Sequence, residues 1–304
     1  MTSSNRKLIT PFSSDYNFWK YYITWKKTYS LIQENETATL SSDFTITDKI
    51  GLINNGVLRI PYGKQLINET ENNISGIIEV ETAVLSNSYW SMLGAPFSNY
   101  KLDAIKEGSK DVSASTFNYT TGNWSNDWAT IETPISNAEG FLLWSFAQEP
   151  TTFTTDAEGE GENYALNNSN EITVTKDLTT YQEGNWFALA NPYPFKIDVD
   201  KFIETNKTNI QGKDGIYKLD NEGEFQYIIE GEINVTEGFF VNYVSSDEQT
   251  VTFAKKQRLT TAKAEKKKEY IKVKMQDGER ESTLLFSLNP EAKQEYDIYD
   301  ANKL

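Results

Sequence analysis

The chain has 304 residues and carries 44 acidic against 29 basic side chains, a formal net charge of −15. A surface this acidic should repel nucleic acid and anionic membrane, so we expect no nucleic-acid partner. Mean hydropathy is low, at −0.58, but aromatic residues reach 13 %. Because disordered chains are poor in aromatic residues, we expect this one to fold.

Cysteine and histidine are both absent, and each absence excludes a class of chemistry. Without cysteine there is no disulfide, no thiolate nucleophile and no thiolate-bound metal. Without histidine there is no Ser-His-Asp triad and no histidine-bound zinc. An enzyme of this composition would have to use carboxylates, Lys, Tyr or Ser.

The start of the chain, "MTSSNRKLITPFSSDYNFWKYY", lacks the apolar core of a secretory leader, and no run of 18 apolar residues follows it. Two explanations remain. The chain is either cytosolic, or a mature piece of a longer protein to which a Met was added. We favour the second, because of the resemblance described below.

Residues 1–71 form an N-terminal segment that is rich in short strand patterns. Between residues 38 and 82, strand-length apolar pieces alternate with Asn and Gly corners, and "GVLRIPYGKQLI" is the most regular of them. This pattern predicts short stacked rungs, or a meander, leading into the next unit.

Residues 72–155 and 168–254 are two copies of one unit, which predicts two similar β-lobes. Three equivalent pairs lie 96 residues apart: Trp90 with Trp186, Leu93 with Leu189, and Pro96 with Pro192. Further along, "AEGFLLWSF" aligns with "TEGFFVNYV" at a separation of 98 residues. A long solenoid needs about three or more repeats, so two copies favour two lobes.

Nearly all of both copies consists of short strand patterns separated by Gly, Asn and Asp turns. Helical periodicity is confined to Val199 to about Thr205, with Asp198 as the N-cap, and to a weaker pattern near Lys101 to Lys106. The predicted fold class is therefore all-β: tandem duplicated β-sandwich-like lobes, with an N-terminal strand-rich segment and few short helices.

The stretch "GNWFALANPYPF" contains two prolines that fix the backbone and bias the residues before them to extended geometry. Asn191 can hydrogen-bond neighbouring backbone in a turn. We therefore interpret the "NPYP" segment as a rigid corner from strand to helix, in preference to a ligand site.

Residues 255–268, "KKQRLTTAKAEKKK", are the only basic stretch. Charge runs of this kind are usually solvated linkers, which is our expectation, and the alternative is an electrostatic dock for an acidic partner. Residues 269–304 are the start of a third, truncated β unit, in which "YIKVKMQDGERESTLLFSL" predicts a hairpin that turns at "QDGE".

The second copy resembles the repeat of large secreted surface proteins of Bacteroidota, on "GNWFALANPYPFKIDVDKF", "DGIYKLDNEGEFQYI" and "INVTEGFFVNYVSS". In those proteins a Trp-Leu-Gly-Asn-Pro-Tyr-Pro segment leads to a short helix, an aromatic hairpin, a Gly-Phe-Phe-Val strand and an Arg, a place that Arg258 takes. The ending "STLLFSLNPEAKQEYDIYDANKL" is similar to the segment that follows in them. The resemblance covers roughly residues 85–304, and the first copy departs from it, with "GAPF" where the family has "NPYP".

Such proteins commonly carry a C-terminal sorting domain for the type nine secretion system. The resemblance therefore implies an extracellular or cell-surface location and the secretion machinery as a partner of the full-length protein. It implies surface display, adhesion or a scaffold, with no fixed catalytic residues.

The aromatic loop "NYTTGNWSNDW" is the best ligand-binding candidate in the sequence. Flat aromatic rings can stack on the apolar faces of sugars while amides and carboxylates bond the hydroxyls. The candidate residues are Tyr119, Asn123, Trp124, Asn126, Asp127 and Trp128. The alternative is that these tryptophans cover the open edge of the lobe.

Two acidic stretches suggest oxygen ligands for Ca²⁺. Asp156, Glu158 and Glu160 alternate in "DAEGEGEN", and Asp297 and Asp300 lie in "YDIYDAN". Neither stretch has the full Asp-x-Asp-x-Asp-Gly pattern of a calcium loop, so a solvated acidic loop is the alternative.

The function that we expect is a non-catalytic extracellular surface protein, an adhesin or a partner-binding scaffold, whose partner is a glycan or a protein at the cell surface. The alternative is a glycan-binding module of a secreted carbohydrate-active protein. A carboxylate-dependent glycoside hydrolase is a third class, but with 44 acidic residues suitable carboxylate pairs arise unavoidably.

Overall fold

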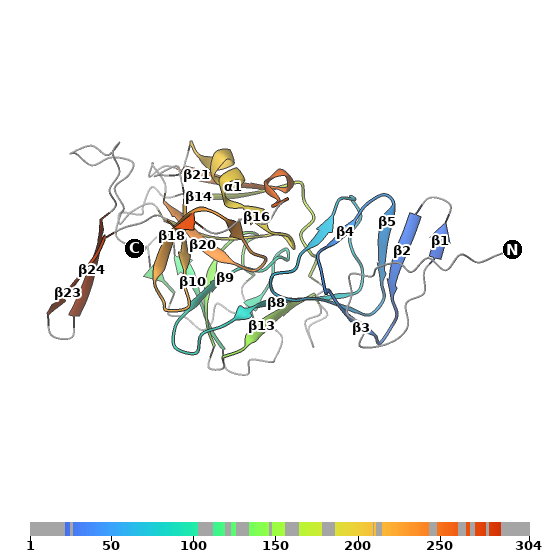
Figure 1. Cartoon of the computed structure of the whole chain (residues 1–304), viewed down its shortest axis with the longest axis horizontal. Helices are drawn as coiled ribbons and strands as arrows, with labels where there is room; N and C mark the ends of the chain where they lie inside the picture. Colours follow the sequence, from blue (N-terminus) through green and yellow to red (C-terminus); the bar gives the residue numbers. More distant parts are fainter. Residues whose placement is uncertain are drawn as a thin grey trace.

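The computed structural model confirms an all-β chain, in which α1 is the single α-helix of the part described (Figure 1). The structure describes residues 22–24, 27–102, 112–118, 123–125, 134–145, 148–155, 164–177, 186–208, 210, 215–242, 248–260, 266–267, 271–277 and 280–286. Within these ranges no helix has the length and apolar character needed to cross a membrane.

The N-terminal coil, residues 27–84, is built from stacked parallel strands, so the prediction of stacked rungs is confirmed. Strand β2 pairs with β5, and β4 pairs with β7. Strand β3 pairs with β6, which in turn pairs with β8. The paired residues lie 20 to 22 positions apart in the chain, as in Thr37↔Val57 and Thr28↔Ile50. The strands are β1 (Tyr22–Thr24), β2 (Lys27–Ile32), β3 (Thr37–Thr39), β4 (Phe44–Ile46), β5 (Ile50–Asn54), β6 (Val57–Ile60), β7 (Leu66–Asn68) and β8 (Ile77–Val84).

Buried asparagines hold the corners of the coil. The Asn54 side chain donates to the Ile77 carbonyl of the next rung at 2.9 Å and accepts from the Gly56 backbone at 3.2 Å. Asn68 donates to the Asn72 carbonyl at 2.7 Å. Each amide supplies a donor and an acceptor, so it satisfies corner backbone groups that no strand pairs.

Strand β8 belongs to two structures at once, because it pairs with β6 in parallel and with β13 in antiparallel fashion. The coil and the first lobe consequently share one apolar core, which runs from Ile32 to Tyr164 and also includes Val235 of the second lobe. The predicted boundary after residue 71 falls between β7 and β8. The first lobe adds β9 (Ser91–Leu93), β10 (Val112–Asn118), β11 (Asn123–Trp124), β12 (Phe141–Ser145) and β13 (Pro150–Thr154).

The second lobe is a sandwich around its own core. A five-stranded sheet, β15-β20-β17-β18-β22, faces the β14-β21 pair and helix α1. Its elements are β14 (Glu171–Asp177), β15 (Trp186–Ala190), β16 (Ile197–Asp198), α1 (Val199–Asn206), β17 (Ile216–Leu219), β18 (Phe225–Glu230), β19 (Glu232–Ile233), β20 (Gly238–Asn242), β21 (Glu248–Ala254), the 3-10 helix η3 (Lys255–Gln257) and β22 (Lys266–Lys267).

Helix α1 confirms the predicted helix and its cap. The Asp198 carboxylate accepts from the Asp200 backbone at 3.1 Å, which satisfies one of the free donors of the first turn. Phe202 and Ile203 bury the inner face of the helix. The weaker helix pattern near Lys101 extends into residues outside the described part.

The hairpin of β23 (Ile271–Asp277) and β24 (Arg280–Phe286) confirms the turn predicted at "QDGE". In Figure 1 it lies at the opposite end of the molecule from β1.

The strand order repeats between the lobes, as the duplicated sequence suggests. The central strand β12 lies between β10 and β9 in the first lobe, and β20 lies between β17 and β15 in the second. The lead-in strand of each copy pairs with its last strand, with Val80 opposite Phe153 and Ile172 opposite Phe253.

The two copies contact each other reciprocally. Leu93 bridges to Glu237, and its equivalent Leu189 bridges to Glu139, the equivalent of Glu237. The turns before both glutamates match as well, since Ala138 and Thr236 have φ of 64° and 68°. A pseudo-two-fold relation therefore connects the lobes, and their outer sheet faces bury a third apolar cluster: Met92, Phe117, Leu142, Trp186, Ala188 and Phe240.

Candidate functional site

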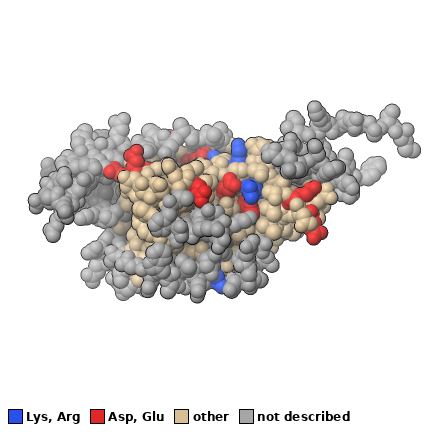
Figure 2. All heavy atoms as spheres, turned by 90° about the horizontal axis from the view of Figure 1, so that it is seen from below, with Lys and Arg blue, Asp and Glu red and all other residues tan. Residues whose placement is uncertain are grey.

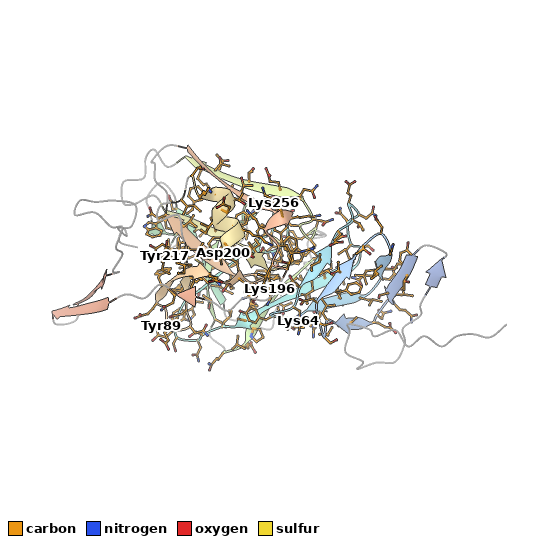
Figure 3. The ribbon with its side chains drawn as sticks, turned by 45° about the horizontal axis from the view of Figure 1, so that its top comes forward. Lys64, Tyr89, Lys196, Asp200, Tyr217 and Lys256 are labelled. Atoms are coloured by element: carbon orange, nitrogen blue, oxygen red, sulfur yellow. The ribbon has the colours of Figure 1, made fainter. Side chains whose placement is uncertain are left out.

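A groove of about 320 Å³ lies where the end of β7 meets η3 of the second lobe. Figure 3 labels one of its lining residues, Lys256. The groove is lined by Ile67, Asn68, Glu69, Asn170, Phe195, Lys255, Lys256 and Arg258. Since its walls come from the coil, the inter-lobe segment and the second lobe, it exists only in the assembled fold.

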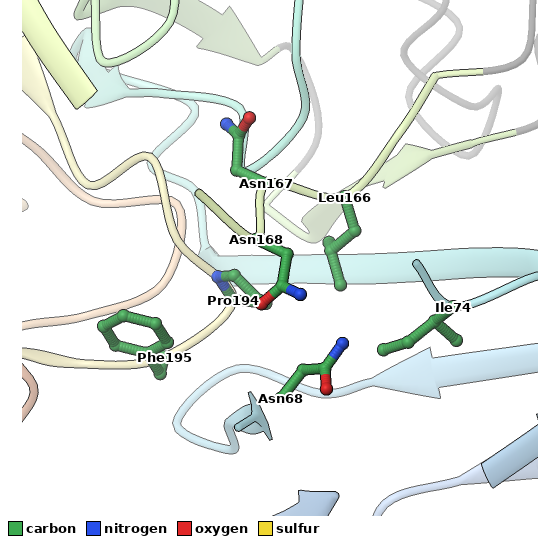
Figure 4. Close-up of a pocket in the computed structure, with 7 residues that line it drawn as sticks. All are labelled: Asn68, Ile74, Leu166, Asn167, Asn168, Pro194 and Phe195. Carbon is green, nitrogen blue, oxygen red and sulfur yellow. The ribbon is translucent and has the colours of Figure 1, made fainter. Parts of the chain in front are cut away.

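A second, much smaller hollow adjoins the groove and shares Asn68 and Phe195 with it. Figure 4 shows its lining side chains, among them the amides Asn167 and Asn168. Its volume of about 10 Å³ is close to the space of one water molecule. This hollow is therefore a seam between packed segments, and the groove is the candidate site.

Phe195, directly after the "NPYP" corner, lines the groove, and Asn191 holds that corner. Asn191 is fully buried. Its amide nitrogen donates to the carbonyls of Phe195, Ile233 and Asn234 at 2.8, 3.2 and 3.1 Å. Its oxygen accepts from the Tyr193 backbone at 2.9 Å. The corner is thus rigid, as its sequence predicts.

The same corner is bonded to the N-terminal coil. The Leu66 backbone donates to the Pro194 carbonyl at 2.8 Å, and the Lys196 backbone donates to the Gln65 side chain at 3.0 Å. Asn167 donates to the Pro192 carbonyl at 2.9 Å. These bonds fix the coil, the inter-lobe segment and the second lobe around the groove.

Tyr193 lies behind the groove, stacked on Phe195 with ring centroids 4.6 Å apart. Its hydroxyl donates to the Phe253 carbonyl at 3.1 Å. Burial, and secondarily the charge of Glu171, raise the pKa of the Tyr193 phenol well above its usual value of about 10. The folded chain therefore keeps this proton at a pH where the unfolded chain releases it.

We expect the Tyr193→Phe variant to lose the alkaline sensitivity that follows from this pKa. The contribution of the neutral phenol is complete below about pH 10, and it is lost as the pH rises because the unfolded state binds fewer protons. Between about pH 10 and 12, wild-type unfolding free energy should fall more steeply than that of the variant, by up to about 1.4 kcal/mol per pH unit. Urea titrations across this range measure the two slopes, and equal slopes would contradict the assignment.

The basic wall of the groove is a short turn held by Gln257. This side chain is fully buried, accepts from the Ala254 backbone at 2.9 Å and donates to the Thr252 carbonyl at 3.0 Å. The neighbouring Leu259 backbone donates to the Lys196 carbonyl at 2.8 Å. The expectation of a solvated linker is therefore wrong for residues 255–259, which are anchored and present three cationic side chains to the groove.

The three cations differ in their partners. Arg258 contacts the Glu69 carboxylate at 3.2 Å. Lys255 donates to the Asn68 carbonyl at 3.4 Å, and its pKa is lowered by burial and partly restored by the charge of Glu71. Lys256 is exposed and has no ion pair with any described residue.

The lining of the groove carries more cations than carboxylates. Figure 2 shows one face of the molecule, on which acidic and basic side chains are interspersed over a largely uncharged surface. The groove instead combines three cations with one carboxylate, two amides and the apolar side chains Ile67 and Phe195. Such a lining offers charge pairing, hydrogen bonds and an apolar contact to one small ligand.

Of the predicted ligand-binding residues, the structure describes two, on strand β11. Tyr119, Asn126, Asp127 and Trp128 lie outside the described residues, as do Asp156, Glu158, Glu160, Asp297 and Asp300. Asn123 pairs with Asn118 in the β10–β11 hairpin. The calcium sites stay predictions, and among the described residues no group of three acidic side chains is close enough to hold a metal ion.

Trp124 packs into the aromatic cluster between the lobes. Its ring lies 5.2 Å from Phe117 and 5.7 Å from Phe240, edge to face in both cases. Trp124 is half-buried, so part of the ring stays accessible. Its packing agrees with the covering role that we gave as the alternative, and a sugar-stacking role stays a prediction.

The sequence did not single out the groove as a whole, because its residues are scattered. The basic stretch was the one usable signal, and the electrostatic dock was the weaker of its two interpretations. Asn68 and Lys255, which hydrogen-bond each other, are 187 residues apart in the chain. No spacing rule connects them.

No curated protein and no solved structure matches this chain. One family model does, and its match covers residues 26–226, from the N-terminal coil through the first lobe and into β18 of the second. The chain therefore belongs to the family described as Domain of unknown function (DUF8693).

Proposed function

We propose that this chain is a non-catalytic extracellular surface protein, an adhesin or a partner-binding scaffold, secreted by a bacterium of the Bacteroidota type. The resemblance of the second copy to the repeat of large secreted surface proteins supports this location and, in the full-length protein, export by the type nine secretion system. The partner would be a glycan or a protein at the cell surface.

The observation that carries the proposal is the groove between the coil and the second lobe. Hydrogen bonds to the side chains of Asn191, Gln65 and Gln257 fix the backbone of its walls before any partner arrives. Pre-organised sites of this kind lose little conformational entropy on binding.

The lining of the groove favours binding over hydrolysis. A glycoside hydrolase needs two carboxylates that flank the scissile bond. The groove offers Glu69 as its one carboxylate, and that carboxylate is already paired with Arg258. This supports a non-catalytic role at this site.

A glycan-binding module of a secreted carbohydrate-active protein is the second candidate. Exposed aromatic side chains near the lobe surface favour it, since such rings can stack on sugars. Tyr89 and Trp90 are 44 % and 36 % exposed, and Trp90 meets the Trp144 ring edge-on at 5.6 Å. Trp124 adds a half-buried ring on the neighbouring hairpin.

A glycan array probed with the purified chain tests both candidates. If the aromatic loop contacts sugar, we expect the wild-type chain to bind a glycan on the array and the Trp128→Ala variant to lose that binding. Trp124→Ala is expected to lower the unfolding free energy by about 2 kcal/mol as well, because the ring packs on Phe117 and Phe240. Urea denaturation measures that loss, and Ile50→Ala, at an exposed apolar position of the coil, is the control.

Three outcomes separate the candidates. Hydrolysis of any polysaccharide by the purified chain would contradict a non-catalytic role. Binding to intact cells without binding to any arrayed glycan would favour a protein partner. A native gene with neither an export leader nor a sorting domain would contradict the extracellular location.

A further inference from the structure

The groove concentrates positive charge in a strongly acidic chain. Lys255, Lys256 and Arg258 line it, and Glu69 neutralises one of the three by pairing with Arg258 at 3.2 Å. Neither lysine has an ion pair with any residue that the structure describes, although the charge of Glu71 acts on Lys255. Two cations are therefore available to one anionic group.

The backbone around the groove is already hydrogen-bonded, which disfavours an added peptide strand. The Leu66 backbone donates to Pro194, the Asn68 carbonyl accepts from Lys255, and the Glu69 backbone donates to Ile46. Strand addition needs a free row of backbone donors and acceptors. Recognition here must therefore come from side chains.

Those side chains suit a sugar that bears a carboxylate. The lysines supply the charge, and Asn170 is exposed, with its amide in no hydrogen bond within the described part of the chain. Ile67 and Phe195 provide an apolar surface between them. An acidic pyranose has a carboxylate that pairs with a cation, hydroxyls that hydrogen-bond an amide, and an apolar ring face that packs on an apolar surface.

We propose that this groove binds one uronic acid residue within an otherwise neutral glycan, with Lys255 and Lys256 contacting its carboxylate and Asn170 contacting a hydroxyl. This inference rests on the second proposed function, glycan binding. A polyanion is a poor candidate, because the net charge of −15 would repel its other charges. A volume of about 320 Å³ fits one small ligand unit rather than a long segment.

Calorimetric titration with a matched pair of trisaccharides tests the proposal. One carries a single central glucuronic acid, and the other carries glucose there. We expect the acidic trisaccharide to bind at least tenfold more tightly than the neutral one. The Lys255→Gln/Lys256→Gln double variant should lose at least tenfold in affinity for the acidic trisaccharide. Lys207→Gln, an exposed change on the far end of α1, should leave the affinity unchanged.

The Glu69→Gln variant should bind more tightly than wild type, a result that partial unfolding of the variant could not produce. It removes the one carboxylate in the groove and releases Arg258, so affinity for the acidic trisaccharide should rise several-fold. Unchanged or weaker binding in this variant would contradict the assignment. Thermal melts of all variants confirm that the affinities refer to folded protein.

Other outcomes of these titrations distinguish a failure of the groove assignment from a failure of glycan binding as the function. Equal affinity for both trisaccharides, or a loss confined to Trp128→Ala, overturns the groove assignment and leaves glycan binding standing. Equal binding of free glucuronate, or of a glutamate-containing peptide, with the same lysine dependence overturns the glycan as occupant. Absence of binding to every arrayed glycan overturns both.

Discussion

Asn191→Leu is expected to lower the free energy of unfolding by about 3 to 5 kcal/mol, because it removes one buried side chain that bonds four backbone groups. Three carbonyls lose their donor and the Tyr193 backbone loses its acceptor. Each buried polar group left without a partner costs about 1 to 3 kcal/mol. Leucine keeps the branch at Cγ and leaves no cavity but is larger than asparagine, so the Asn191→Asp variant, which matches asparagine in size, separates lost hydrogen bonding from overpacking.

Two further variants refine this measurement. Asn191→Asp keeps the acceptor for the Tyr193 backbone. It replaces the donor to three carbonyls with an oxygen that repels them, so this variant should also be less stable than wild type. Asn55→Ala, at an exposed position of the coil, should stay within about 0.5 kcal/mol of wild type. Urea denaturation of the three variants gives the comparison, and an Asn191→Leu cost below about 1 kcal/mol would contradict the role of the corner.

Gly94→Ala is expected to cost about 2 kcal/mol or more, because the two lobes leave no room for a side chain there. A Cβ on Gly94 would overlap the Cβ of Ala190, which is its equivalent in the second copy. Gly94 is not among the glycines with positive φ, so backbone strain is not the cause. The cost arises from overpacking across the pseudo-two-fold contact.

The exchange Gly94→Ala/Ala190→Gly tests this cause directly. Ala190→Gly alone should cost about 1 kcal/mol through backbone entropy. In the double variant the space is restored, so a coupling of about 1 to 3 kcal/mol should appear in the mutant cycle. Gly63→Ala is the control, since its cost comes from a φ of 80° in open space and Ala190→Gly should not rescue it. Additive costs for Gly94 and Ala190 would show that the lobes do not meet as described.

Equivalent residues of the two copies can have different surroundings. Trp186 is 2 % exposed and meets Tyr217 at 5.0 Å, whereas Trp90 is 36 % exposed. The sequence motif around the two tryptophans is the same. What differs is the side chains around them, since Tyr217 and Phe240 of the same sheet pack on Trp186, whereas Trp90 meets Trp144.

Local structure could be predicted from the sequence wherever it depends on interactions between residues a few positions apart. Asp198 precedes its helix and caps it, the Asn and Gly corners separate the rungs of the coil, and "QDGE" turns the last hairpin. The duplication was readable too, because its spacing of 96 to 100 residues is carried by residues that hold the same place in both lobes.

The sequence by itself thus determined the all-β class, the two copies and the rigid "NPYP" corner, since strand alternation, turn residues and prolines act over a few positions. Only the tertiary structure decided that the outer faces of the lobes bury one aromatic cluster, and that the basic turn faces the coil. Arg258 and Glu69 are 189 residues apart in the chain and meet because packing of the two cores brings them together. The groove is a product of that packing, and no local rule encodes it.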